Sequence, residues 1–542
     1  MIDVGSISLF LVSIIPLLIL TVMDLKKSLH MAQQNSYNKD FHFLKWIVKD
    51  VLEFYNSFKL NIILLIIIPI LGLINLANTL VVRIILVVFT LVIMFFKIKE
   101  NASKETKIKL KYTARVKRLI VTYLVLTILI FTIATINSNS YLYTSYLIVF
   151  AYNFLTHLVM VLVLLINTPI EKLVYLNFKN KALKKLNDYK NLSVIGVTGS
   201  FGKTSSKNIL AEILGIKYNV LPSPKSFNTP YGLIITVNEY LDKFDDILIA
   251  EMGARREGEI KELCDLVKPK YGILTRIGEA HLESFGSIDV IENTKFELIE
   301  SLPSDGIGVI NLDDEYQLHH EIQNDCKIIS IGILNIDADV IAKDIKTSSD
   351  GTKFKVKFKR SKKEYEFTTK LLGVANIYNI LASLALAKEF GLTEKEMQKS
   401  VAKIKPIEHR LELREAGNIT YIDDAFNSNP IGAKMALDVL STMPDKRVIV
   451  TPGMIELGDY QYDLNKEFGR QMKDKCDEVI LVGKKQTKPI QDGLEEVKFA
   501  PTKIHVVKDL TEALDYVKNK YQDKKVYVLL ENDLPDAFSE KE

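Results

Sequence analysis

The chain has 542 residues, 48% of them hydrophobic and 25% charged, which is long enough for roughly three to four domains. It has no Gly/Pro/Ser-rich tract, and its three cysteines are widely spaced, so disordered, collagen-like and disulfide-scaffold classes are excluded. The 70 basic and 66 acidic residues nearly balance, so no nucleic-acid partner is expected.

Long apolar runs are concentrated before residue 170. Each is close to the ~20 residues that cross a ~30 Å hydrocarbon layer as a helix. The sequence therefore predicts an all-α membrane domain over residues 1–190 with about five transmembrane helices. The runs are 7–23, 61–76, 79–96, 119–136 and 146–166.

Basic residues alternate between the loops that join these runs. Residues 24–60 hold six Lys or Arg, 97–118 hold nine and 167–190 hold six, whereas 77–78 and 137–145 hold none. Because cytoplasmic loops carry the basic excess, everything after residue 167 is expected in the cytoplasm. The basic loops set the topology or contact anionic membrane lipids. We therefore expect a multi-pass protein of the cytoplasmic membrane.

After residue 191, short β-branched runs alternate with helical stretches, which predicts α/β structure with a parallel sheet. Its first strand, 193–197, precedes a glycine-containing loop and a helix, the context of a phosphate-binding P-loop. In this loop Lys203 can reach the β- and γ-phosphates and the Thr204 hydroxyl can hold magnesium. The spacing is not the standard one, because Gly196 lies six residues before Gly202. The loop residues are Thr198, Gly199, Ser200, Phe201, Gly202, Lys203 and Thr204.

Two further predicted strands are followed by residues that could bind a metal or a phosphate. Glu251 directly follows the strand 246–250, and a carboxylate at that edge of a parallel sheet points toward the ligand crevice. It is a candidate magnesium ligand, with a solvated edge acid as the alternative. His281 follows the strand 271–277, where it has a metal or phosphate role or is a structural loop histidine.

Lys295 lies in an apolar stripe of the helix predicted over 288–302. A buried ammonium needs a partner or a changed chemical state. One interpretation is an ion pair with an acid such as Glu251. The other is carbamylation, which converts the lysine into a carboxylate.

The remaining pattern predicts a small antiparallel sheet over 327–370, with a hairpin turn at Asp350–Gly351, and then a helix over 376–390. Lys405–Pro406 marks a domain boundary. Strands are predicted at 420–422, 447–451, 478–482, 504–507 and 526–530. We therefore expect a central ATP-binding domain over 191–405 and a smaller Rossmann-like α/β domain over 406–542.

Taken in order, these segments resemble the Mur ligase family, most closely its MurF-type members, the UDP-N-acetylmuramoyl-tripeptide–D-alanyl-D-alanine ligases. The resemblance covers about residues 193–460. Besides the P-loop, it rests on Ser226–Gly232, Glu251–Gly253, Ile277–Leu282, Lys295–Glu297, Gly373-x-x-Asn376-x-x-Asn379, His409–Arg410, Asp423–Pro430 and Gly453–Gly458.

The resemblance implies a role for each matching residue. Lys203 and Thr204 would bind phosphate and magnesium, with Glu251 and His281 completing two magnesium sites. Lys295 matches a lysine that is carbamylated in several members. Asn376 and Asn379 would lie near adenine, unless Asn376 is only a helix N-cap. Arg410 and Asp424 would reach the nucleotide, and Asn228, Asn427 and Asn429 would face the substrate.

The activity implied is that of a bacterial ATP- and Mg2+-dependent ligase that forms a carbon–nitrogen bond through an acyl phosphate. Its partners would be a cell-envelope precursor carboxylate, UDP-linked or lipid-linked, and an amino acid or dipeptide. Membrane runs stand where soluble members have a UDP-sugar-binding domain, and Leu530–Pro535 stands where a Lys-Gly-Ser motif is common. Both departures leave the acceptor and the amine open.

Other functions remain compatible with the sequence. One is a polyglutamate-type ligase or an amidotransferase subunit acting on a lipid-linked precursor. Another, from a different class, is a nucleotide-gated membrane transporter or regulator that carries a ligase domain.

Overall fold

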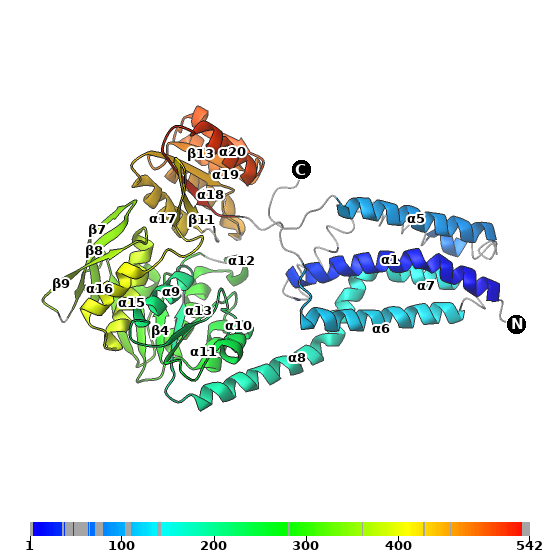
Figure 1. The fold of residues 1–542 in the computed structure, drawn as a ribbon, viewed down its shortest axis with the longest axis horizontal. Coiled ribbons are helices and arrows are strands. Elements are labelled where there is room, and N and C mark those ends of the chain that lie inside the picture. The colour runs from blue at the N-terminus through cyan, green and yellow to red at the C-terminus, as the bar shows by residue number, and fades with distance from the viewer. Residues whose placement is uncertain are drawn as a thin grey trace. The chain divides into compact units, whose positions relative to one another are not determined.

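The computed structural model describes residues 4–34, 37, 47, 63, 66–70, 80–102, 110–137, 142–279, 282–359, 361–425, 429–455 and 457–533. The chain forms two compact units, Met1–Leu176 and Asn177–Glu542. The first is helical and the second is α/β (Figure 1).

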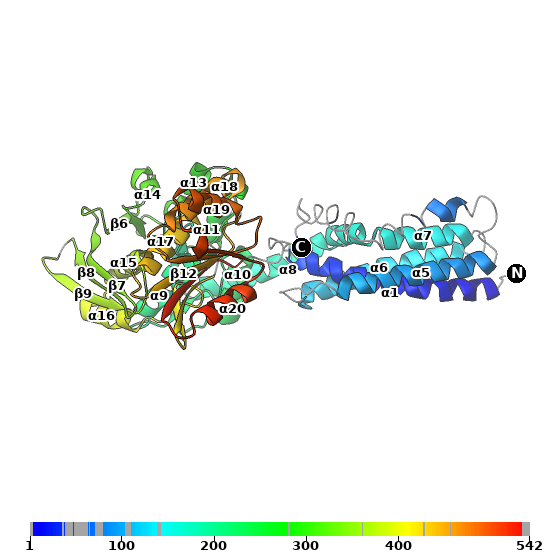
Figure 2. The same cartoon turned by 90° about the horizontal axis from the view of Figure 1, so that it is seen from above.

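The helical unit is a bundle in which α1, α5, α6 and α7 lie side by side (Figures 1 and 2). The apolar run predicted over 146–166 does not form one helix, because α7 ends at Phe154 and α8 begins at Thr156. Most of the run 61–76 lies outside the described residues. The helices are α1 Val4–Gln34, α5 Leu80–Ala102, α6 Ala114–Asn137, α7 Leu142–Phe154 and α8 Thr156–Asp188, the last of which extends into the second unit.

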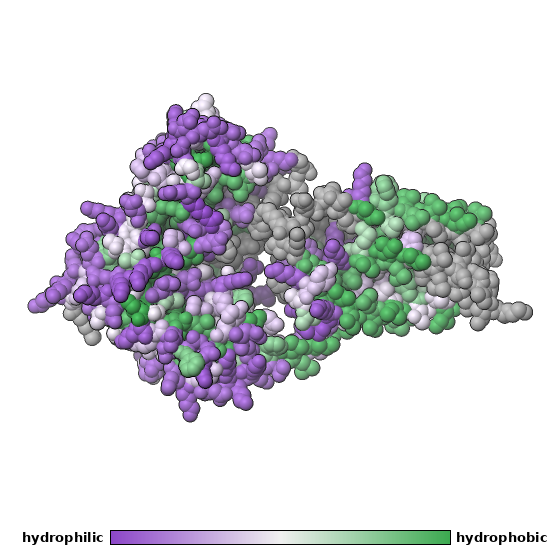
Figure 3. All heavy atoms as spheres, viewed as in Figure 1, coloured by the Kyte–Doolittle hydropathy of each residue, from purple (hydrophilic) through white to green (hydrophobic). Residues whose placement is uncertain are grey.

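The bundle exposes large apolar side chains and buries polar ones. Buried polar residues include Thr21, Asp24, Asn153 and His157, while leucine, isoleucine and valine side chains of α5, α6 and α8 face outward. Hydrophobic residues cover much of its visible surface (Figure 3). Among the described residues, Ala114–Ile136 and Thr156–Asp188 are long and apolar enough to cross a membrane, judged by length and composition alone.

Over the described residues, the central part of the α/β unit has a nine-stranded sheet in the order β2-β3-β1-β4-β5-β6-β7-β8-β9. The strands from β2 to β7 pair in parallel, and β7, β8 and β9 pair antiparallel. The strands are β1 Ser193–Thr198, β2 Val220–Pro222, β3 Ile247–Glu251, β4 Tyr271–Leu274, β5 Ile307–Asn311, β6 Lys327–Gly332, β7 Val340–Ser348, β8 Gly351–Phe358 and β9 Glu364–Thr369.

This topology corrects one prediction. The antiparallel strands of 327–370 do not form a separate small sheet, because β6 pairs in parallel with β5, and β7 joins the edge of the main sheet through β6. The β7–β8 hairpin does turn at the predicted place, with Ser348 paired to Gly351.

Helices cover both faces of the nine-stranded sheet. Ile195 and Val197 of β1 pack into a core shared with α9 and α15, whereas a Cβ at Gly196 would lie 2.6 Å from Leu298 of α13. Strand side chains alternate between faces, so glycine at 196 lets α13 approach closely. The helices are α9 Lys203–Leu214, α10 Pro230–Ile235, α11 Glu259–Val267, α12 Leu282–Phe285, α13 Ile288–Glu300, α14 Glu315–His319, α15 Val374–Glu389 and α16 Glu394–Lys403.

The C-terminal part contains a six-stranded sheet in the order β10-β11-β15-β12-β13-β14, parallel except for β10. The sequence pattern did not predict β10. The strands are β10 Glu412–Ala416, β11 Ile419–Asp424, β12 Lys446–Thr451, β13 Glu478–Val482, β14 Ile504–Val507 and β15 Val526–Glu531, with helices α17 Pro430–Ser441, α18 Gln461–Gln471, α19 Lys488–Glu496 and α20 Leu510–Lys520.

Candidate functional site: a P-loop and its adjoining cavity

The P-loop connects β1 to α9, as the sequence predicts. Gly199 and Gly202 have φ angles of 143° and 81°, which side chains other than glycine rarely adopt. The amides of Ser200 and Phe201 donate to the Arg276 carbonyl at 2.9 and 3.2 Å. The amides at the start of α9 have no partner within the helix, so they are the ones in this loop that could contact a phosphate.

Lys203 folds back over this loop. Its Nζ donates to the carbonyls of Gly199 and Ser200 at 2.7 and 3.0 Å. Burial lowers the pKa of Lys203 to about 8; the Glu251 carboxylate opposes the shift and the nearby Arg410 charge adds to it. An anion bound at the loop would replace the carbonyl partners and favour the charged amine.

Glu251 is the last residue of β3 and is 1% exposed, so the solvated edge acid considered from the sequence is wrong. Its Oε1 accepts hydrogen bonds from the Thr204 hydroxyl at 3.1 Å and the Asn228 amide at 3.2 Å. Its Oε2 lies 3.0 Å from Nζ of Lys207, which is also 1% exposed. The counterion of Glu251 is thus Lys207, not Lys295.

Lys295 lies on the buried face of α13, as its helical spacing predicts. Its Nζ lies 5.4 Å from the centre of the Phe285 ring and has no hydrogen bond or ion pair to any described residue. Burial, followed by the charge of Lys203, lowers the pKa of Lys295 to about 7. A large fraction of this side chain is therefore a neutral amine near pH 7.

The oxygen atoms of Glu251 and Thr204 are of the kind that binds Mg2+. A carboxylate and a hydroxyl, meeting at the start of the P-loop helix, are the hard oxygen ligands that this cation prefers, and Mg2+ usually keeps several waters. The described residues contain no cluster of three or more His, Cys, Asp or Glu side chains suited to a metal. His281, predicted as a further ligand, lies outside the described residues.

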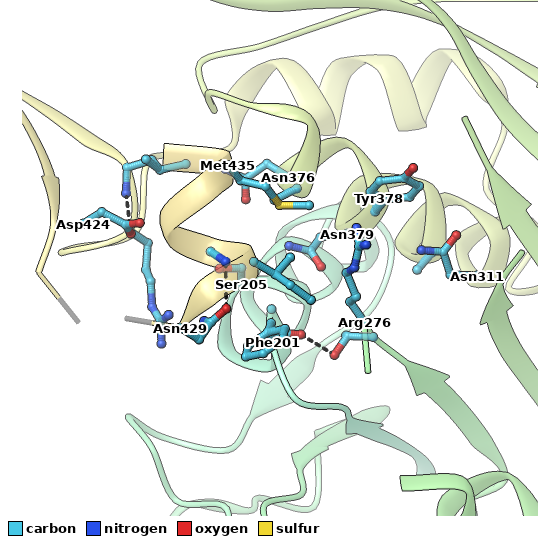
Figure 4. Close-up of a pocket in the computed structure, with 18 of the residues that line it drawn as sticks. Phe201, Ser205, Arg276, Asn311, Asn376, Tyr378, Asn379, Asp424, Asn429 and Met435 are labelled. Atoms are coloured by element: carbon cyan, nitrogen blue, oxygen red, sulfur yellow. Dashed lines mark hydrogen bonds between the residues drawn. The ribbon is translucent and has the colours of Figure 1, made fainter. Parts of the chain in front are cut away.

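A cavity of about 120 Å³ adjoins the P-loop. Its lining includes Phe201 and Gly202 from the loop, the predicted adenine residues Asn376 and Asn379, and residues of the C-terminal part (Figure 4). From that part come Arg410, Asp424, Asn429 and Glu531. The N-cap of α15 is Gly373, so the alternative of Asn376 as an N-cap is wrong. Asn427 lies outside the described residues.

Asp424 and Glu531 lie opposite each other on neighbouring parallel strands, β11 and β15. Burial raises the pKa of Asp424 to about 7, and the charge of Arg410 opposes that shift. Asn429 is the N-cap of α17. Its side-chain Oδ1 accepts a hydrogen bond from the Gly432 amide at 2.7 Å, so this oxygen is already engaged within the fold. Its substrate role remains a prediction.

Sequence reasoning missed several residues of this site. Lys207 follows Lys203 by one helical turn, and Asn311 ends β5 at the ligand edge of the sheet, so spacing and strand position could have indicated both. Arg276, Tyr378 and Glu531 also line the cavity. Glu531 directly follows the predicted strand 526–530, so strand position could have indicated it too, whereas nothing in the local sequence distinguishes Arg276 and Tyr378 from ordinary surface residues.

Family models match two parts of the chain. Residues 197–387 match the Mur ligase middle domain, and residues 409–530 match the Mur ligase, glutamate ligase domain. Both matches fall within the α/β unit.

Curated relatives align over 54% of the chain. The UDP-N-acetylmuramoyl-tripeptide–D-alanyl-D-alanine ligases of Bacillus subtilis and Escherichia coli are 33% and 31% identical to it, and the alignments cover 63% and 64% of those proteins. The chain therefore spans slightly less than two thirds of their length.

Solved structures show the same fold. The MurF ligase of Thermotoga maritima in complex with ADP aligns with a TM-score of 0.59 and 26% identity, over 66% of this chain and 80% of that one. MurF from Acinetobacter baumannii aligns with a TM-score of 0.61 and 24% identity, over 67% and 78% of the two chains.

Proposed function

Because the chain belongs to the Mur ligase family over residues 197–530, we propose that it is an ATP-dependent, ADP-forming ligase of the MurF type. It joins the carboxylate of a cell-envelope precursor to the amine of an amino acid or dipeptide. One observation carries the proposal. Thr204, Asn228 and Lys207 hold Glu251 at the head of the P-loop helix, beside Lys203 and a cavity lined from both parts of the α/β unit.

The reaction has two steps. A carboxylate oxygen forms a bond to the γ-phosphorus of ATP, and ADP leaves. The amine nitrogen then attacks the acyl carbon of the acyl phosphate and loses a proton, and phosphate leaves as the amide forms. Mg2+, held by Thr204 and Glu251, would offset charge on the phosphoryl oxygens. Lys203 adds a second positive charge from the loop, and Arg410 adds a third from the C-terminal part.

We propose that Lys295 is carbamylated in the active enzyme. A neutral amine is the form that adds CO2, and the lowered pKa of Lys295 makes that form abundant near pH 7. The added carboxylate would place an anionic oxygen ligand beside Lys203, in a space where the described residues give Lys295 no anionic partner. His281 is proposed as a further ligand of the same metal centre.

We propose that residues 1–190 form a multi-pass membrane domain, with the ATP-binding domain 191–405 and the C-terminal domain 406–542 in the cytoplasm. The outward apolar side chains and buried polar residues of the helical unit support this, because lipid, unlike water, accepts an apolar exterior. The cytoplasmic placement rests on the basic loops. A precursor held at the inner leaflet, such as a lipid-linked one, is the acceptor we favour.

The test uses the purified full chain in detergent, with release of ADP and phosphate as the readout. Release should require an acceptor and an amine together. A UDP-linked muramoyl tripeptide with D-alanyl-D-alanine and a lipid-linked equivalent form the two acceptor arms. Lys203→Met, which removes the P-loop amine, should abolish release. ATP hydrolysis that proceeds equally without acceptor and amine would contradict the proposal.

A further inference from the structure

Arg276 links the P-loop to the cavity. It lies two residues after the end of β4, and its carbonyl accepts from the amides of Ser200 and Phe201. Its side chain lines the cavity and extends between Asn379 and Tyr378 (Figure 4). The backbone of Arg276 therefore supports the loop, while its guanidinium faces the space beside it.

The Arg276 guanidinium makes no hydrogen bond or ion pair to any described residue, and its Nε is buried without a partner. A buried unpaired donor destabilises a fold. Its position is therefore not explained by packing of the described residues.

Nearby carboxylates do not satisfy this guanidinium. Asp314 accepts from the Ile277 amide at 2.7 Å and from Gln317 at 2.8 Å. Asp313 accepts from the Tyr378 hydroxyl at 2.8 Å and from the backbone amides of residues 333–335. Both acids accept these hydrogen bonds from the turns around the cavity, and no described residue pairs with the Arg276 guanidinium, so its donors are available to a ligand.

We infer that Arg276 is a nucleotide-binding residue that contacts the base of a purine nucleotide. This rests on the proposed function for the presence of a nucleotide, and it adds a residue that sets base selectivity. The phosphate end of the site is served by Lys203 of the P-loop. The Arg276 guanidinium instead lies among the amide and phenol groups of Asn379 and Tyr378.

A purine suits this environment. A guanidinium is planar, donates in its plane to ring nitrogens and exocyclic oxygens, and stacks on aromatic faces. Asn311 and Asn379 add amide groups that both donate and accept, as recognition of a base edge requires. A base-free polyphosphate offers neither a ring face nor a ring nitrogen.

The test compares ADP with inorganic tripolyphosphate, each titrated calorimetrically into full-length wild-type and Arg276→Met protein. Methionine keeps an unbranched side chain and removes the donors. Arg276→Met should weaken ADP binding by roughly tenfold, the scale of a desolvated cation–π or charged contact, and leave tripolyphosphate affinity within about twofold. Lys203→Met is the control and should weaken both ligands.

Melting temperature without ligand is the second readout. Since Arg276→Met removes an unsatisfied donor, the variant should melt at or above the wild-type temperature, with a smaller rise on adding ADP. The inference is overturned by unchanged ADP affinity, by an equal loss of tripolyphosphate affinity, or by a variant that melts lower or does not fold. Wild type that binds neither ligand would instead overturn the proposed function.

Discussion

Replacing Lys295 with methionine should stabilise the protein at neutral pH. The Lys295 side chain is 3% exposed, and burial lowers its pKa from 10.5 to about 7. Each tenfold difference in proton affinity between the folded and unfolded chain is worth about 1.4 kcal/mol. Burying this amine therefore costs the fold about 5 kcal/mol at low pH and about 4 kcal/mol at pH 7.

The sign of the pH dependence follows from the lowered pKa. Between pH 7 and 10.5 the unfolded chain binds more protons at this lysine than the folded chain does, so stability rises with pH across that window. Below pH 7 the full penalty is present, and above 10.5 it is absent. Methionine, which is similar in length and uncharged, removes the penalty at every pH.

The assay is thermal unfolding of wild type and Lys295→Met between pH 6 and 10, in buffer depleted of CO2. The variant should melt roughly 10 °C above wild type at pH 7, at about 2–4 °C per kcal/mol for a unit of this size, and the gap should narrow as pH rises. Added bicarbonate should stabilise wild type alone, because only an amine is carbamylated. A gap independent of pH, or a variant that melts lower, would refute this reasoning.

Three further predictions concern the same site. Glu251→Gln should lower the free energy of unfolding, measured in urea titrations, by about 3 kcal/mol, because it leaves the buried Lys207 ammonium without a counterion. Adding Lys207→Met to this variant should recover stability. If the double variant instead loses the sum of the two single losses, the two side chains do not act as a pair. Asp424→Asn should flatten the dependence of stability on pH between pH 4 and 7. The raised pKa of Asp424 makes the folded wild type bind more protons than the unfolded chain, so wild type loses stability as pH rises through this window. A variant whose melting temperature changes with pH as steeply as that of wild type would contradict this prediction. Gly202→Ala should weaken ADP binding at least tenfold, because residue 202 has a φ of 81° and a Cβ there would lie 2.9 Å from Asn379 Oδ1. If calorimetry gives the variant the ADP affinity of wild type, the loop tolerates the strain and the prediction is wrong.

Local pattern was sufficient for the parts of the site that are close in sequence. Strand, glycine loop and helix follow one another without a break from Ser193 to Leu214, so β1, the P-loop and α9 could be predicted from one segment. Likewise, helical periodicity alone placed Lys295 on the buried face of α13. Prediction of the end of β3 also located Glu251, since carboxyl ends of parallel strands meet at one edge.

Pairing between distant segments was not predictable in this way. The strands of 340–369 have the alternation of an independent antiparallel sheet, yet β7 pairs with β6 and extends the main sheet. The break between α7 and α8 falls inside a continuous apolar run, where composition is uniform. The residue pattern near these positions gives no sign of either the β6–β7 pairing or the break between the two helices.

The amino-acid sequence by itself determined that this chain has a phosphate-binding loop, an acid at a strand end and an amine on an apolar helical face, because each depends on neighbours within about 20 residues. Only the tertiary structure decided that Glu251 pairs with Lys207 instead of Lys295, and that the Arg276 guanidinium faces the cavity without a partner among the described residues. The physical reason is that the charge state and partners of a buried group depend on which side chains packing brings within a few ångströms. The separation of two residues along the chain does not indicate whether packing brings their side chains together.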